Sequence, residues 1–154
     1  MVSGTAKFLG FEEGWAEFEH KMADRVVQFS RTVFIDIVVN SPQWSQNLAS
    51  NWNYAAGAPN YSYIEHPEKK KRRYTPFQRG DSPVVENTIS RMQHVPGPKW
   101  GQTTFISNAT PDDRGGYLQK NIESGTVRLR PVNLVEGQQQ LFGYIMDKYQ
   151  GYQV

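Results

Sequence analysis

The chain has 154 residues, which fits one domain with a single hydrophobic core, and its net charge of +2 is too small to indicate a nucleic-acid partner. It contains no cysteine, which excludes disulfides, thiolate metal ligands and a cysteine nucleophile. The N-terminus lacks a basic-then-apolar signal pattern, and no apolar run approaches the roughly 18 residues of a membrane span. We therefore expect a soluble protein made in the cytoplasm, with no membrane partner.

Aromatic residues are abundant for so polar a chain. The mean hydropathy is −0.66 and 38% of the residues are hydrophobic, yet 13% are aromatic, with four Trp, eight Tyr and eight Phe. Two interpretations stay open. The rings fill a small core, or part of them is buried between subunits, where Trp and Tyr are enriched.

Residues 11–39 have the periodicity of one long helix. Their apolar stripe recurs at steps of three or four and consists of Phe11, Trp15, Phe18, Met22, Val26, Phe29, Val33 and Ile37. Glu and Asp crowd its first turns, where the helix dipole favours them. Further apolar residues in its last turns predict deeper burial of the C-terminal half, and Pro42 ends the helix. Such a long apolar face needs a sheet or a neighbouring subunit to cover it.

The segments on either side of this helix and after it are shorter. Residues 1–10 show no periodicity and are expected to form an N-terminal arm. Alternating side chains predict a strand at 48–55, and a short second strand is expected at 61–65. Residues 66–80 form a basic loop or hairpin insertion that is longer than compact domains usually contain.

The second half of the chain predicts several more elements. Ser82 and Pro83 suit the start of a helix over 83–94. The remaining expected elements are a strand at 102–107, a short helix at 117–124 with Gly125 behind it, an extended segment at 127–131, and a last helix that Asn133 and Glu136 begin and that ends at Tyr149.

Together these elements predict an α+β fold in one structural domain, residues 1–154. The long N-terminal helix packs on a small, mainly antiparallel sheet, and two or three shorter helices close it. Four apolar residues are expected to hold the sheet to the helix: Leu48, Trp52, Phe105 and Ile106.

Nothing in the sequence indicates catalysis. The histidines at positions 20, 66 and 94 have no ligand spacing to one another or to carboxylates. The adjacent acidic pairs at 12–13 and 112–113 do not face each other across one helical turn, as an acid–base couple would need. No nucleophile elbow or phosphate-binding loop is present. We therefore predict that the chain is not an enzyme and has no catalytic residue, metal site or cofactor.

The strongest local charge signal is a run of five cations with aromatic residues just behind it, namely Lys69, Lys70, Lys71, Arg72 and Arg73, then Tyr74 and Phe77. Such a run grips phosphates and stacks on bases in some proteins. Glu65 and Glu68 next to it weaken the nucleic-acid interpretation. A protein contact and a solvated loop remain alternatives. Trp44, Trp100 and Tyr152 lie outside the predicted core and are further candidates for a partner interface.

Three stretches in order, Val38-Val39-Asn40-Ser41-Pro42, Leu48-Ala49-Ser50-Asn51-Trp52 and Ala56-Gly57-Ala58-Pro59, resemble a pattern in the neck and minor tail proteins of tailed bacteriophages. In that family a long N-terminal helix ends in Thr-Pro-Val-Asp-Thr-Gly, and a Leu-Arg-Ala-Asn-Trp strand and a Gly-x-Pro turn follow. Phe105-Ile106-Ser107-Asn108, Tyr117 and Ile122-Glu123-Ser124-Gly125 resemble later pieces. The chain departs from the pattern at Gln43-Trp44-Ser45-Gln46, and the basic loop with the helix at 83–94 looks like an insertion.

The resemblance implies a structural virion protein of the phage neck, made in the cytoplasm of the bacterial host. Such proteins form homo-oligomeric rings, here a hexamer or dodecamer, that join head to tail around the DNA channel. A tail terminator or tail-completion protein is the first expectation. A head-completion stopper or adaptor ring, or a DNA-binding module that uses residues 69–73, is the alternative. The implied partners are further copies of the chain, portal, neck or tail-tube proteins, and DNA that passes through the lumen without sequence recognition.

Overall fold

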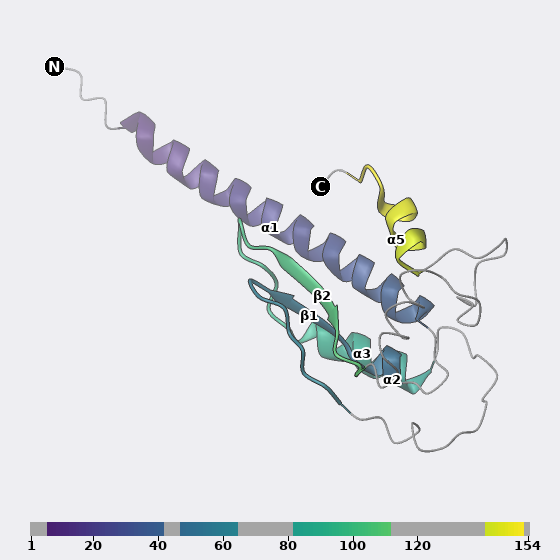
Figure 1. Ribbon diagram of the computed structural model, residues 1–154. Coiled ribbons are helices and arrows are strands. Elements are labelled where there is room, and N and C mark those ends of the chain that lie inside the picture. Colours follow the sequence, from purple (N-terminus) through teal and green to yellow (C-terminus); the bar gives the residue numbers. More distant parts are fainter. Residues whose placement is uncertain (1–5, 42–46, 65–81, 112–140, 153–154) are drawn as a thin grey trace, which may run out of the picture.

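The computed structural model describes residues 6–41, 47–64, 82–111 and 141–152. Its elements are the helix α1 (Ala6–Asn40), the single turn α2 (Asn47–Ser50), the strand β1 (Trp52–Ala56), the helix α3 (Pro83–Gln93), the strand β2 (Thr104–Asn108) and the helix α5 (Leu141–Tyr149). The two strands, α2 and α3 gather on one side of α1, and α5 lies on another side (Figure 1). The predicted α+β class, with a long helix, a small antiparallel sheet and shorter helices, is confirmed.

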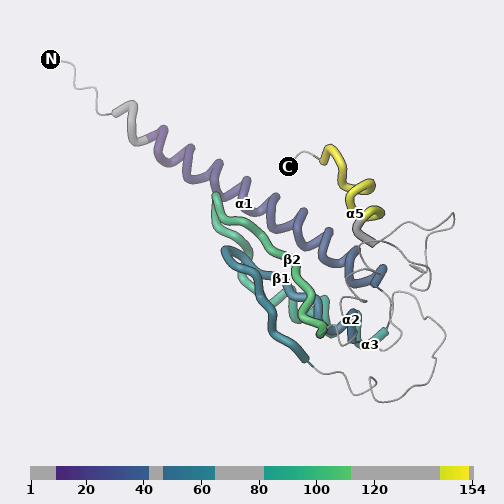
Figure 2. The backbone as a smooth tube through the Cα atoms, viewed as in Figure 1, coloured from purple at the N-terminus to yellow at the C-terminus, as the bar shows by residue number. Residues whose placement is uncertain are grey.

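Helix α1 is longer than predicted and is only partly covered. It has 35 residues and begins at Ala6, so the prediction that residues 6–10 belong to an arm is wrong; residues 1–5 lie outside the described part. Its length is about 52 Å at ~1.5 Å per residue. The prediction of deeper burial toward its C-terminus is confirmed by Phe34, Ile37 and Val38. Its N-terminal half extends beyond the rest of the domain (Figure 2).

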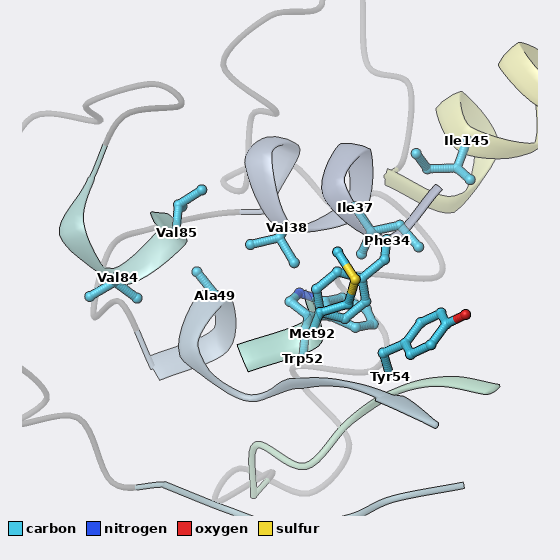
Figure 3. Packing of buried hydrophobic residues seen from close by; sticks show 10 residues of the cluster. All are labelled: Phe34, Ile37, Val38, Ala49, Trp52, Tyr54, Val84, Val85, Met92 and Ile145. Carbon is cyan, nitrogen blue, oxygen red and sulfur yellow. The ribbon is translucent and has the colours of Figure 1, made fainter. Parts of the chain in front are cut away.

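The hydrophobic core lies between the C-terminal half of α1 and the elements that pack around it on two sides. It consists of Phe34, Ile37, Val38, Ala49, Trp52, Tyr54, Val84, Val85, Met92 and Ile145 (Figure 3). The ring of Phe34 meets that of Tyr54 edge to face, with centroids 6.1 Å apart. Polar groups at the same contact are paired, because the hydroxyls of Ser30 and Tyr54 lie 2.8 Å apart and the Trp52 indole donates to the Ser41 hydroxyl at 2.7 Å.

The predicted strand at 48–55 is wrong in its first half. Asn47–Ser50 forms a helical turn, and the strand begins only at Trp52. All four residues of α2 are buried, partly against α3, so their side chains do not alternate between a wet and a dry face. Local hydrogen bonds also favour the turn, since the Ser50 hydroxyl and the Asn51 amide both donate to the Asn47 carbonyl.

Strands β1 and β2 form a two-stranded antiparallel sheet in which Tyr54 pairs with Ile106 and Ala55 with Phe105. Paired residues share a face, and neighbours along a strand point to opposite faces. Ile106 therefore joins Tyr54 on the core side, as predicted. The prediction that Phe105 holds the sheet to the helix is wrong, because Phe105 points to the other face.

Residues 61–64 belong to no strand, so the short strand predicted at 61–65 is wrong for the four residues that the structure describes. Instead of strand pairing, two asparagine side chains, one in β1 and one just before it, bind the backbone of this segment. The amide of the buried Asn51 accepts from the Ile64 N–H at 2.7 Å and donates to the Ile64 carbonyl at 2.8 Å. The Asn53 amide donates to the Ser62 carbonyl at 3.0 Å. This second anchor fixes the segment along the sheet edge.

Helix α3 and the connection behind it position α1. The predicted N-cap is confirmed, since the Ser82 hydroxyl accepts from the Val85 N–H and Pro83 opens the helix. After α3, the Arg31 guanidinium donates to the Val95 carbonyl at 3.1 Å. A Cβ added at Gly97 would lie only 2.4 Å from a methyl group of Val27. The connection therefore lies directly against the middle of α1.

Helix α5 packs on α1 from another side and corresponds to the end of the predicted last helix. The Asp36 carboxylate of α1 accepts from Lys148 at 2.6 Å and also from the Tyr149 hydroxyl. The rest of that predicted helix, and the elements predicted at 117–124 and 127–131, lie outside the described residues.

We predict that Gly97→Ala lowers the free energy of unfolding by about 1–3 kcal/mol, because the new methyl group overlaps Val27 and the packed loop must move. Urea denaturation followed by circular dichroism measures the change. Gly14→Ala is the matched control: it adds the same methyl group to α1 in open space and should leave stability equal or higher. Equal stability of both variants would contradict the close approach of the loop to α1.

Candidate interaction surface

The N-terminal half of α1 displays a row of exposed aromatic side chains. Phe11, Trp15 and Phe18 follow at steps of four and three, which places them on one face of the helix. They are 68%, 48% and 45% exposed. The rings of Phe11 and Trp15 stack with centroids 6.3 Å apart, and those of Trp15 and Phe18 are 5.5 Å apart. A continuous apolar surface results.

Trp100 extends this row from the connection between α3 and β2. Its ring meets Phe18 edge to face at 6.0 Å and is itself 46% exposed. The turn that presents it continues through Gly101, whose φ of +78° suits glycine. We call Phe11, Trp15, Phe18 and Trp100 the aromatic row. It combines two segments that are more than 80 residues apart in the sequence.

The charges around the aromatic row on α1 are acidic. From Gly10 to His20 the helix contains four glutamates and neither lysine nor arginine. Glu19 accepts a hydrogen bond from the Trp15 indole at 2.7 Å, and a spacing of seven places Glu12 on the same edge. Glu17 instead pairs with Lys21 at 2.6 Å, and the hydrogen bond from that lysine lowers the pKa of the Glu17 carboxyl.

The same helical stripe is covered farther along α1. Phe29 contacts Tyr149 edge to face at 5.5 Å and stacks on Tyr152 at 4.5 Å. The segment that includes α5 therefore shields the stripe at this level. Within the described part of the chain no such cover lies over Phe11 and Trp15. The prediction that the whole stripe needs a covering partner thus divides into a part covered within the chain and a part left exposed.

The Asp36 carboxylate joins α1 to α5 and helps to raise the pKa of both of its hydrogen-bond donors. Its hydrogen bond raises the pKa of Lys148 to about 12. Burial, and then the hydrogen bond to Asp36, raise the pKa of Tyr149 to about 12. Both shifts favour the charge state that Asp36 binds, a protonated amine and a neutral phenol. The arrangement fixes α5 and offers no reactive group.

The structure separates the two candidate interface residues that it describes. Trp100 belongs to the aromatic row, whereas Tyr152 stacks on Phe29, about 16 Å farther along α1 from Phe18 at ~1.5 Å per residue. The other candidates lie outside the described residues: Trp44, Lys69, Lys70, Lys71, Arg72, Arg73, Tyr74 and Phe77.

Phe11, Trp15 and Phe18 were not predicted as interface residues. Periodicity assigns them to the same apolar stripe as Phe29 and Val33, and it cannot tell which part of a stripe the domain is long enough to cover. The excess of glutamate beside them was the available signal.

The described residues contain no cluster of His, Asp and Glu that could hold a metal ion, and none of their helices is long and apolar enough to cross a membrane. They form an α+β domain whose most prominent surface feature is the aromatic row on a projecting helix. Comparison with known proteins finds no matching family model, no similar curated protein and no similar solved structure. The functional argument therefore depends on this surface and on the residue patterns.

We predict that Asp36→Asn lowers the free energy of unfolding by about 1 kcal/mol at pH 7, a small value because Lys148 is partly exposed and solvent screens the pair. Raised pKa values stabilise the folded protein below the unfolded values near 10, and this contribution is lost as pH rises toward about 12. Denaturation of both proteins between pH 7 and 12 should show the difference shrink above pH ~10. A difference that stays constant to pH 12 would contradict the assignment.

Proposed function

We propose that this chain is a structural subunit of the neck of a tailed bacteriophage, where it forms a homo-oligomeric ring that joins head to tail around the DNA channel. A tail terminator or tail-completion role is the first choice, and a head-completion stopper or adaptor ring is the alternative. The observation that most strongly supports an assembly role is the exposed aromatic row on the projecting half of α1.

Exposed aromatic side chains keep apolar surface in contact with water, which is unfavourable unless a partner covers it. Contiguous apolar patches on soluble proteins mark interaction surfaces, and Trp and Tyr dominate the energetics of protein interfaces. Phe11, Trp15, Phe18 and Trp100 form such a patch in contact with one another. A partner that covers them removes from water the largest exposed apolar side chains of α1.

The shape of the protomer supports a ring. A compact body bears a helix whose N-terminal half reaches away from it (Figure 1). When such a projection meets a different surface on the next copy, the contact is heterologous, and a fixed rotation closes it into a ring. We propose six or twelve copies, with portal, neck or tail-tube proteins as the neighbours and with DNA passing through the lumen without sequence recognition.

The rival from another class is a DNA-binding module that uses Lys69–Arg73. Five consecutive cations support it, but the surface that the structure describes on α1 is acidic and would repel phosphate. Binding of duplex DNA whose affinity falls steeply with salt and disappears when these five residues are neutralised would favour the rival.

We predict that the chain occupies one position in purified phage particles, the junction of head and tail. A small peptide tag at the C-terminus, labelled with gold-conjugated antibody and viewed by negative-stain electron microscopy, locates it. A tagged tail-tube protein serves as control and should label the whole tail. Particles that lack the chain, or label spread along the tail, would contradict the proposed function.

A further inference from the structure

We propose that the aromatic row, with Glu12 and Glu19 on its edge, is the docking surface for the basic segment 69–77 of a second copy of this chain. The contact is head to tail: the projecting end of α1 on one copy receives the basic segment of the next. Only its biological setting rests on the proposed neck function; the contact itself is a property of the isolated protein.

The glutamates beside the aromatic row need an explanation that the helix itself does not supply. A helix dipole favours acidic residues in the first turn and its effect falls off beyond that turn. Because α1 begins at Ala6, its first turn contains no acidic residue, and the glutamates follow later. Lys21 pairs with Glu17, while Glu12 and Glu19 lie on the edge of the aromatic row. An acidic edge on an apolar surface suits a basic partner.

The basic segment has the complementary composition. Lys69 to Arg73 supply five adjacent cations, and Tyr74 and Phe77 follow them. Cations attract carboxylates and also the faces of aromatic rings, with Trp the strongest acceptor. Aromatic residues of the segment can add ring contacts to Phe11 and Trp15. Within the whole sequence no other stretch has so many consecutive cations.

Chain length prevents the first cations of the run from reaching the far end of the aromatic row in their own copy. The segment is anchored at Ile64, which binds Asn51, and at Ser82, which begins α3 beside Val38. From Val38 to Trp15 the helix rises about 35 Å. The chain from Ile64 to Lys69 spans at most about 18 Å, and to Lys71 at most about 25 Å. Lys69, Lys70 and Lys71 therefore contact Phe11 and Trp15 only when another molecule supplies them.

This arrangement gives each protomer two different complementary surfaces. The aromatic row lies toward the N-terminal end of α1, and both anchors of the basic segment lie level with its C-terminal half (Figure 1). One surface of each copy then binds the other surface of the next, the heterologous contact that a ring requires. Attraction between exposed charges weakens with salt, so assembly should be favoured at low ionic strength.

Charge reversal tests the pairing directly in the full-length protein. Sedimentation equilibrium at low salt measures self-association of the wild type, of Glu12→Lys with Glu19→Lys, and of Lys70→Glu with Arg72→Glu. We expect each pair of substitutions to weaken association at least about tenfold, and all four together to restore most of it, because opposite charges then face each other again. Circular dichroism checks that every variant is folded.

The matched control is Glu13→Lys with Glu17→Lys. It changes the net charge of the same helix by the same amount but lies away from the aromatic row, since Glu13 follows Phe11 by two positions and Glu17 follows Trp15 by two. We expect its association to stay within about threefold of the wild type.

A second measurement covers weak association. The chain has no cysteine, so Glu19→Cys and Lys71→Cys can be made in separate proteins and mixed under oxidising conditions. We expect a disulfide between the two variants at a higher yield than between Glu13→Cys and Lys71→Cys. The preferred disulfide supports docking in trans.

Several results would overturn the proposal. The first is a wild type that stays monomeric at millimolar concentration and gives no preferred disulfide. The second is unchanged self-association after charge reversal of residues 70 and 72. The third is a folded fourfold variant whose self-association is not restored. Salt-sensitive DNA binding that needs Lys69–Arg73, without self-association, would assign the segment to nucleic acid instead. None of these results depends on where the chain lies in a phage particle, so the neck function and the docking proposal can fail separately.

Discussion

The fold depends on a mismatch between the length of helix α1 and the length of the core that covers it. Helix α1 is about 52 Å long, and the small core formed by β1, α3 and α5 covers only its C-terminal half. All the buried residues of α1 belong to that half, namely Ser30, Phe34, Ile37 and Val38. The other half has the same apolar periodicity but no described element of its own chain above Phe11 and Trp15. A helix built this way is a core element at one end and a free surface at the other.

Polar side chains hold a neighbouring segment against the sheet, as backbone hydrogen bonds between strands do in larger sheets. Asn51 binds the backbone of Ile64 through both atoms of its amide, and Asn53 holds Ser62. The two-stranded sheet thereby gains a third chain segment without a third strand. Arg91 similarly ties α3 to the Ser50 carbonyl, and burial of its guanidinium lowers the pKa of that group. These contacts stabilise a domain whose sheet alone is too small to be stable.

Local signals in the sequence were enough for the elements with strong periodicity or clear caps. The long helix and the Ser82 cap of α3 follow from spacing and capping rules. The sequence named both Phe105 and Ile106 as core residues, and only the strand register separates them. The turn Asn47–Ser50 was missed because the sequence alternates through this stretch as it does in the strand that follows. The local hydrogen bonds to the Asn47 carbonyl and the burial against α3 that favour a turn do not show in that alternation. The exposed state of Trp15 could not be predicted either, because periodicity describes a face and not what covers it.

The projecting half of α1 also affects how the protein behaves in solution. An elongated particle meets more friction than a sphere of equal mass, so a 17.7 kDa monomer of this shape elutes early from a gel-filtration column. Its apparent size on the column then exceeds that of a compact monomer of the same mass. Stoichiometry is therefore better read from light scattering or native mass spectrometry, which respond to mass and not to outline.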